Sequence, residues 1–200
     1  MKARVQTKEV REAILDATDQ LLARYGYKKM TIDDLAKEVG IGKGSIYLHF
    51  KSKEEIVLSL TDRVIARECV KLREFANQTS SHEHRLRKMI TFRVTYRFDA
   101  VNHYSQSVDE LLASLRNQII ARRRKYHTAE AKVLADVIKD GQKNKVFVKG
   151  DPMELARLFL LATSALLPLS LSTRELGKRA EIENKAKQVA KLLVKGIKKS

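Results

Sequence analysis

The chain has 200 residues, 44% of them hydrophobic, which is ordinary for a globular protein that buries a core. Its 40 lysines and arginines exceed the 24 acidic residues by 16, and such an excess favours polyanions such as nucleic acid, although it can also serve solubility alone. A single cysteine, Cys69, excludes an intramolecular disulfide, and no signal peptide is apparent. The most apolar run (158–171) is shorter than the roughly 18–20 residues that span a bilayer. We therefore expect a cytoplasmic protein with no membrane partner.

The whole sequence has the periodicity of helices, because apolar residues recur three or four positions apart and only 8 glycines and 2 prolines occur. We therefore expect an all-α fold of about nine helices. The first helix should end at Gly26. Its single apolar stripe consists of Val10, Ile14, Ala17, Leu21 and Tyr25.

Residues 31–53 contain two short amphipathic segments joined by a glycine turn. Thr31 and Asp34 have the spacing of a capping box, which starts the first segment. Gly40 falls in the turn, where a residue tolerant of positive φ is needed. The apolar side chains expected between the segments are those of Leu35, Val39, Ile41 and Ile46. The second segment is left with a donor-rich outer face that can enter the major groove of DNA. This face consists of Lys43, Gly44, Ser45, Tyr47 and His49.

The remaining helices follow from caps and apolar spacing. Ser52 and Glu55 repeat the capping device before a long fourth helix that should run to about Phe75. Asp151 followed by Pro152 is a strong start signal for a nearly all-apolar helix. The expected breaks are a polar loop at 77–84, an interruption at 102–107, a loop at 141–150 and a last loop at 173–179. The final amphipathic stripe consists of Ile182, Ala186, Val189, Leu193 and Ile197.

The N-terminal quarter resembles the DNA-binding helix-turn-helix of the TetR (tetracycline-repressor) family of transcriptional regulators. The resemblance covers residues 8–60 and rests on the amphipathic lead helix, Thr31, Ala36, Gly40, the run GKGSIYLHF and Lys53. It implies double-stranded DNA as a partner. Thr31, Tyr47 and Lys53 would contact phosphates, Lys43 and Ser45 would read bases, and Gly44 would let the backbone approach the groove. The chain departs from the family at Leu48, where many members carry a second aromatic residue. The predicted DNA-binding set is Thr31, Lys43, Gly44, Ser45, Tyr47, Leu48, His49 and Lys53.

The resemblance also implies two domains with different functions. Residues 1–53 would form a three-helix DNA-binding domain, and residues 54–200 a helical domain that binds a ligand and forms a homodimer through the last two helices. The residues predicted to line the ligand cavity are Met89, Phe92, Arg93, Tyr96, His103 and Phe159. Any one of them can instead simply pack the core, and Arg93 with Arg97 can either meet an anionic ligand or lie in solvent.

Other candidate sites are weaker. GIGKGS (40–45) lacks the Gly-Lys-Ser/Thr order of a phosphate loop. His82 and His84, expected in a loop, are two positions apart and do not share a helix face, so no metal site is predicted. Cys69 is expected to be a small buried side chain rather than a redox sensor. The basic run 122–125 is expected on the solvent-exposed face of a helix. No catalytic set and no cofactor motif emerges, so we do not expect an enzyme.

The function predicted from these patterns is a ligand-responsive transcriptional repressor. As a homodimer it would be released from a palindromic operator by an unidentified small-molecule inducer. Two alternatives remain. An architectural DNA-binding protein without a ligand would use the net charge of +12 on residues 54–200 to bind DNA regardless of sequence. An all-α enzyme with an incidental helix-turn-helix would turn over a substrate in the middle third of the chain.

Overall fold

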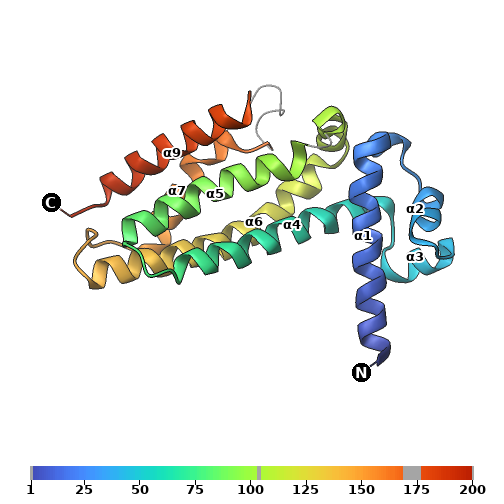
Figure 1. The fold of residues 1–200 in the computed structure, drawn as a ribbon, viewed down its shortest axis with the longest axis horizontal. Coiled ribbons are helices and arrows are strands. Elements are labelled where there is room, and N and C mark those ends of the chain that lie inside the picture. The colour runs from blue at the N-terminus through green and yellow to red at the C-terminus, as the bar shows by residue number, and fades with distance from the viewer. Residues whose placement is uncertain (1, 103–104, 169–176, 200) are drawn as a thin grey trace. The chain divides into compact units, whose positions relative to one another are not determined.

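The computed structural model describes residues 2–102, 105–168 and 177–199, and over these ranges the chain is all-α, as predicted (Figure 1). The described residues form eight α-helices and one short 3₁₀ helix. Their bounds are α1 Lys2–Lys29, α2 Ile32–Val39, α3 Lys43–His49, α4 Lys53–Ala76, α5 His82–Asn102, α6 Ser105–Lys143, α7 Pro152–Ala162, η1 Ser164–Leu166 and α9 Arg179–Gly196. No helix among these is long and apolar enough to cross a membrane.

The chain divides into two compact units. Unit 1 comprises residues 1–64 and 103–119, and unit 2 comprises residues 65–102 and 120–200. Helices α4 and α6 therefore each contribute residues to both units. The assignment of a DNA-binding role to 1–53 and of a ligand-binding and dimerisation role to 54–200 stays a prediction.

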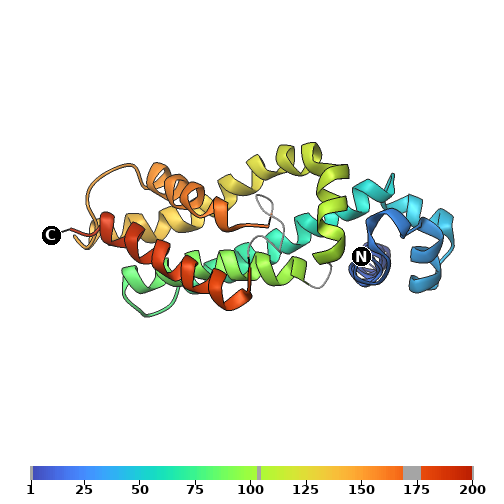
Figure 2. The same cartoon turned by 90° about the horizontal axis from the view of Figure 1, so that it is seen from above.

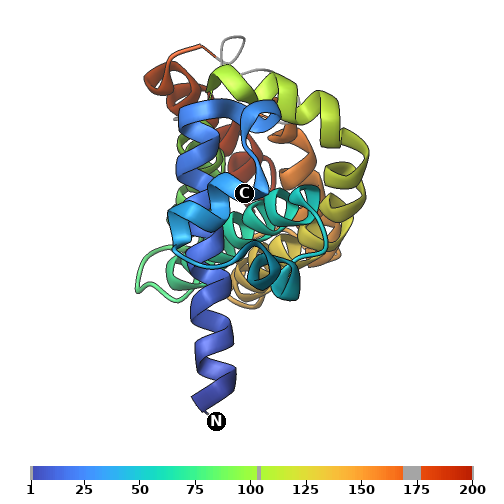
Figure 3. The same cartoon turned by 90° about the vertical axis from the view of Figure 1, so that its right-hand side faces the viewer.

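In unit 1, α2 contacts both α1 and α3, and α1 runs on beyond both short helices toward its N-terminus (Figures 1 and 3). The predicted capping box starts α2, since the Asp34 amide donates to Thr31 Oγ1 (3.1 Å) and the Thr31 amide donates to Asp34 Oδ2 (3.0 Å). Gly40 ends α2 in the left-handed region, with φ +74°, as predicted. Leu35 of α2 and Ile46 of α3 are fully buried.

The end of α1 differs in detail from the prediction. Gly26 does break the helical conformation, with φ +77° and ψ +170°, but helical turns resume after it up to Lys29. The predicted stripe is correct for Ile14, Ala17 and Leu21 and wrong for Tyr25, which is 46% exposed. Tyr27 is buried instead. The irregular backbone at Gly26 changes the helical phase only for the residues after it, including Tyr27.

The start of α4 also departs slightly from the expected pattern. The Glu55 amide donates to Ser52 Oγ (3.2 Å), as a capping box requires. The Glu55 carboxylate, however, accepts from the Lys51 amide (2.7 Å) rather than from the amide of Ser52. The helix then runs to Ala76, one residue past the predicted end.

In unit 2, α5 and α9 lie side by side, and α9 also contacts α7 (Figures 1 and 2). The buried face of α9 is displaced by one position from the prediction over its second half. Ala190 and Val194 are buried, while Val189 and Leu193 are only half-buried. Ile182 and Ala186 are buried as expected. The main core of unit 2 includes Leu72, Leu86, Met89, Ile90, Leu134, Ile138, Phe147, Phe159, Leu160 and Val194.

Helix α7 begins as predicted and ends earlier. Asp151 caps it by accepting from the Met153 amide (2.8 Å). The nearly all-apolar helix predicted after Asp151 is shorter than the apolar run 158–171, because α7 stops at Ala162 and the 3₁₀ helix Ser164–Leu166 follows. The hydroxyl of Thr163 donates to the Phe159 carbonyl (2.9 Å) and that of Ser164 to the Leu160 carbonyl (2.7 Å). These side-chain bonds satisfy carbonyl groups at the point where the helix tightens and ends.

Two loops complete unit 2. The polar loop before α5 covers only residues 77–81, so the prediction that His82 and His84 lie in a loop is wrong; both begin α5. After α6, Phe147 is buried and its ring lies where a Cβ on Gly141 would sit, 2.2 Å from Phe147 Cδ2. Any side chain at Gly141 would displace this ring. Helix α5 ends at Asn102, at the start of the predicted interruption, and α6 already begins at Ser105.

Candidate nucleic-acid interface

The outer surface of α3 carries the side chains that the sequence places there. Tyr47 is 48% exposed and Leu48 85% exposed, and Lys43 and Gly44 are exposed as well. Ser45 and His49 are half-buried. Contact of these residues with DNA stays a prediction, but most of them are exposed, and Ile46 is the buried residue of the helix.

Arg11 of α1 holds the C-terminal end of α3. Its guanidinium donates from Nη1 to the His49 carbonyl (2.9 Å) and from Nη2 to Ser59 Oγ (3.2 Å). The same group lies 4.0 Å from the centroid of the Phe50 ring. The bond satisfies a carbonyl at the end of the helix, where no amide follows to do so. Sequence reasoning missed Arg11, because its partner lies 38 residues away and leaves no local pattern.

Lys43 is not free in this conformation. Its ammonium group donates to Asp33 Oδ2 on α2 (2.9 Å), and both side chains are well exposed. The hydrogen bond and charge of Asp33 raise the pKa of Lys43 above its ordinary value. The lysine predicted to read bases is therefore fully charged and loosely paired with a neighbouring carboxylate, in solvent that screens the attraction.

Two of the predicted phosphate contacts also hold the fold together. Thr31 Oγ1 donates to Asp34 Oδ2 (2.7 Å) within the capping box. Lys53 Nζ donates to the carbonyls of Tyr27 (3.0 Å) and Met30 (3.2 Å), at the end of α1. An ammonium group has three donors, so Lys53 keeps one N–H beyond these two bonds.

Tyr27 connects the end of α1 to the start of α4. Its hydroxyl donates to Glu54 Oε1 (3.0 Å), and Lys53 Nζ lies 4.5 Å from its ring centroid. Burial and the Glu54 carboxylate raise the pKa of Tyr27 to about 12. Arg63 adds a second link, since its Nη1 lies 3.2 Å from Glu12 Oε2 and 2.7 Å from Asp16 Oδ1. These contacts fix α1 against α4 inside unit 1.

The predicted ligand-binding residues lie in different surroundings within unit 2. Met89 and Phe159 are buried in the main core. Phe92 stacks on Tyr96 with ring centroids 5.1 Å apart and meets Phe75 edge to face, also at 5.1 Å. His103 lies outside the described residues.

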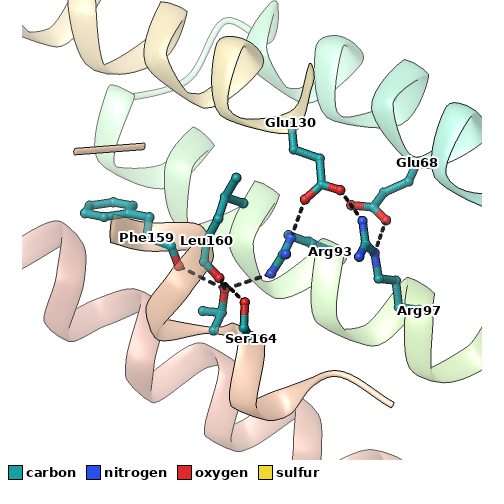
Figure 4. Close-up of polar contacts among 8 residues, drawn as sticks. Glu68, Arg93, Arg97, Glu130, Phe159, Leu160 and Ser164 are labelled. Atoms are coloured by element: carbon teal, nitrogen blue, oxygen red, sulfur yellow. Dashed lines mark hydrogen bonds and ion pairs between the residues drawn. The ribbon is translucent and has the colours of Figure 1, made fainter. Parts of the chain in front are cut away.

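Arg93 and Arg97 belong to a buried ion-pair cluster, together with Glu68 of α4, Glu130 of α6 and Thr163 (Figure 4). Arg93 Nε donates to Glu130 (2.8 Å) and Nη1 to Thr163 Oγ1 (2.9 Å). Arg97 Nε donates to Glu68 (2.6 Å), and Arg97 Nη2 donates to Glu130. The alternative that these arginines lie in solvent is wrong, because they are buried and two carboxylates from other helices pair with them.

The electrostatics of this cluster are uneven. Burial raises the pKa of Glu68 to about 7 despite the nearby Arg97. Burial acts in the same direction on Glu130, but Arg97 and Arg93 outweigh it and hold the pKa of Glu130 below its usual value. Two buried atoms, Glu68 Oε1 and Arg93 Nη2, have no hydrogen-bond partner among the described residues. The cluster is thus close to neutral and incompletely satisfied.

Neither a metal site nor a reactive thiol is found in the described part of the chain. No group of three His, Cys, Asp or Glu residues lies close enough to hold a metal ion. Cys69 is buried, as predicted, and burial raises the pKa of its thiol to about 11. His82 packs edge to face against Phe147. One open cleft of about 410 Å³ lies in unit 2 among α4, α5 and α6, and none of the predicted ligand residues lines it.

Comparison with known proteins identifies the N-terminal region. The family model described as "Bacterial regulatory proteins, tetR family" matches residues 14–60, from the middle of α1 into α4. Residues 14–60 therefore match the DNA-binding region of the TetR family. The HTH-type transcriptional regulator YerO of Bacillus subtilis, itself uncharacterised, is 44% identical over 57 residues, which cover 28% of this chain and 20% of YerO. An uncharacterised regulator of Haemophilus influenzae is 33% identical over 81 residues, which cover 40% of this chain and 43% of that protein.

Solved structures share the TetR fold along nearly the whole chain. A TetR transcription regulator from Haloarcula marismortui has a TM-score of 0.74 at 20% identity and covers 96% of this chain and 100% of its own. The regulator FadR of Bacillus subtilis, solved in complex with stearoyl-CoA, has a TM-score of 0.63 at 18% identity and covers 93% and 98%. The sequence matches to the first curated relatives span only 20–43% of their length. The match of residues 14–60 to a family of transcriptional regulators agrees with the expectation that the chain is not an enzyme.

Proposed function

We propose that this TetR-family chain is a cytoplasmic transcriptional repressor that binds a palindromic operator as a homodimer and is released by a small-molecule inducer. The observation that carries the DNA-binding part is the rigid presentation of α3. Ile46 anchors the helix from within, Arg11 holds its C-terminal carbonyl, and Tyr47 projects into solvent at 48% exposure. A short, fixed helix with a donor-rich outer face suits the major groove of DNA.

Individual residues on this surface would have distinct roles. Lys43 and Ser45 would contact base edges near the start of α3, with Lys43 exchanging its bond to Asp33 for a base or a phosphate. Tyr47, Thr31 and the remaining N–H of Lys53 would bind phosphates and position the helix. The exposed surface of Gly44, with nothing within 4 Å of a Cβ placed there, would allow close approach of the backbone.

The homodimer would form through α7 and α9. Leu158 and Leu161 of α7 are 51% and 65% exposed, and Leu192 of α9 is 70% exposed, although α7 and α9 contact one another. Such exposed leucines favour burial against a second copy of the chain. In a symmetric dimer, the two α3 helices would read half-sites about 34 Å apart on one face of the duplex.

The inducer would bind in residues 54–200. A basic body with a net charge of +12 favours an anionic ligand, and the structurally similar FadR of Bacillus subtilis was solved with stearoyl-CoA. Long-chain acyl-CoA is therefore the first class of inducer to test. To release DNA, the ligand must bind the two conformations unequally, and a coupling of about 1–3 kcal/mol would change operator affinity roughly 5- to 150-fold.

The DNA-binding assignment can be tested with duplexes selected by the full chain from a randomised library. Fluorescence anisotropy over a salt series measures the affinity for selected and random duplexes. The two affinities distinguish residues that bind phosphates from residues that read bases. Tyr47→Ala should weaken binding to both duplexes and flatten the salt dependence, whereas Lys43→Ala should reduce the preference for the selected duplex. Tyr25→Ala, at a tyrosine of α1 that is 46% exposed, is the matched control. Unchanged DNA affinity in Tyr47→Ala would overturn the assignment.

An architectural role is the alternative that the net charge favours. It predicts equal affinity for selected and random duplexes at physiological salt and no release by any acyl-CoA. Competition between the two duplexes distinguishes this alternative from the repressor.

A further inference from the structure

Leu48 is the most exposed large hydrophobic side chain in the part of the chain that the structure describes. It is 85% exposed, and it lies on α3 between Tyr47 and His49. An exposed leucine adds nothing to the core of unit 1. Its position on the helix that carries the proposed DNA contacts therefore calls for a role outside the folded chain.

Leu48 lies on the same face of α3 as Gly44, which has no side chain. Residues four apart share a helix face, so Leu48 lies one turn after Gly44 on the same face and close to Ser45. Helix side chains lean toward the N-terminus, which directs Leu48 back over Gly44. Apart from its chain neighbours and the nearby backbone of α3 itself, nothing lies within 4 Å of a Cβ built at Gly44. On the face where the backbone can approach the groove most closely, Leu48 is thus the large side chain.

The chemistry of leucine limits what it can recognise there. Leucine neither donates nor accepts a hydrogen bond, so it cannot bind a phosphate oxygen or a polar base edge. The major groove displays one apolar group, the C5-methyl of thymine. We propose that Leu48 reads a thymine methyl group in each half-site, and thereby sets the sequence preference at that position. This inference rests on the proposed DNA-binding function.

The expected effect follows from the size of the contact. Removing one buried methyl group should weaken binding about fourfold. The test uses the full chain and the duplex that it selects from a randomised library. Each thymine in one half-site is replaced in turn by uracil, which lacks only the methyl group and keeps its hydrogen-bonding edge. The same series is measured with Leu48→Ala, with Leu48→Met, which keeps an apolar side chain of similar size, and with Val70→Ala, a truncation at a 54% exposed residue of α4.

We expect one thymine whose replacement by uracil weakens DNA binding about fourfold, both for the unmodified chain and for Val70→Ala. The Leu48→Ala variant should bind the thymine and uracil duplexes equally well. Leu48→Met should keep most of the discrimination. If Leu48→Ala stays as sensitive to uracil as the unmodified chain, or if no thymine is sensitive, the thymine contact is refuted while specific DNA binding stands. If the unmodified chain selects no sequence, the proposed function fails first, and the inference fails with it. Because Leu48 is exposed, thermal unfolding should show the same stability for all three variants.

Discussion

Charged side chains behave differently in the two compact units. In unit 1, Lys43 and Asp33 form a solvent-exposed pair, and Arg11 reaches a backbone carbonyl from a half-buried position. In unit 2, Arg93 and Glu130 are each only 1% exposed and bond to one another. Charges near solvent remain available to an external partner at little cost, whereas buried charges depend wholly on each other. The net charge of a protein therefore does not show which of its lysines and arginines are available to bind DNA or a ligand.

The largest expected effect comes from removing the shared carboxylate of the buried cluster. Glu130→Gln leaves both Arg93 and Arg97 short of a counter-charge in the interior and should destabilise the fold by about 3–5 kcal/mol. Denaturant unfolding measures this loss. The control is Glu74→Gln, which breaks an exposed pair with Lys71 and should change stability by less than about 1 kcal/mol. Equal effects in the two variants would contradict the distinction between buried and exposed ion pairs.

The second prediction concerns pH. The pKa of Glu68 is raised from 4.5 to about 7 in the folded chain, so the folded state binds a proton there more tightly than the unfolded state does. This proton binding stabilises the fold fully below about pH 4.5, and the stabilisation is lost as pH rises through about 7. Glu68→Gln cannot titrate, so its stability relative to the unmodified chain should rise by about 2 kcal/mol between pH 5 and pH 8. Denaturant unfolding at both pH values measures the difference. A constant difference between variant and unmodified chain would argue against a buried, titrating Glu68.

The third prediction addresses the half-buried arginine of unit 1. Arg11→Ala removes the bond to the His49 carbonyl and the contact with the Phe50 ring, and should cost about 1–2 kcal/mol. It should also weaken binding to specific and random duplexes alike, because α3 would lose its C-terminal support. Arg24→Ala, whose guanidinium lies 3.7 Å from Glu38 and is exposed, is the control for unfolding and for DNA affinity. A variant that loses neither stability nor affinity would show that α3 needs no such support.

The smallest expected effect lies at the exposed pair. Asp33→Asn releases Lys43 and removes one negative charge beside the proposed DNA surface. Stability should change by less than about 1 kcal/mol. Affinity for random duplex should rise a few-fold at low salt, and the gain should disappear at high salt. Glu38→Gln, at another acidic residue of α2, tests whether the gain depends on the pairing of Asp33 with Lys43 rather than on net charge alone.

How well the sequence predicted each element depended on the range of its contacts. The capping box of Thr31 and Asp34, the left-handed Gly40 and the Asp151 cap were predicted correctly. In each case the decisive bonds or backbone angles lie within a few residues. The predictions for Tyr25 and for Val189 and Leu193 of α9 were wrong, because which side of a helix is buried depends on the elements that pack against it. The helix that starts after Asp151 also ends at Ala162, before the apolar run does.

The sequence by itself determined the all-α class, the start of each well-capped helix and the position of the helix-turn-helix, since these depend on local hydrogen bonds and on apolar spacing. Only the tertiary structure decided that Arg97 meets Glu68 and Glu130, 29 and 33 residues away, and that Arg11 supports α3. The physical reason is that a buried charge needs an opposite charge in space, and the chain can supply it from any helix that packs nearby.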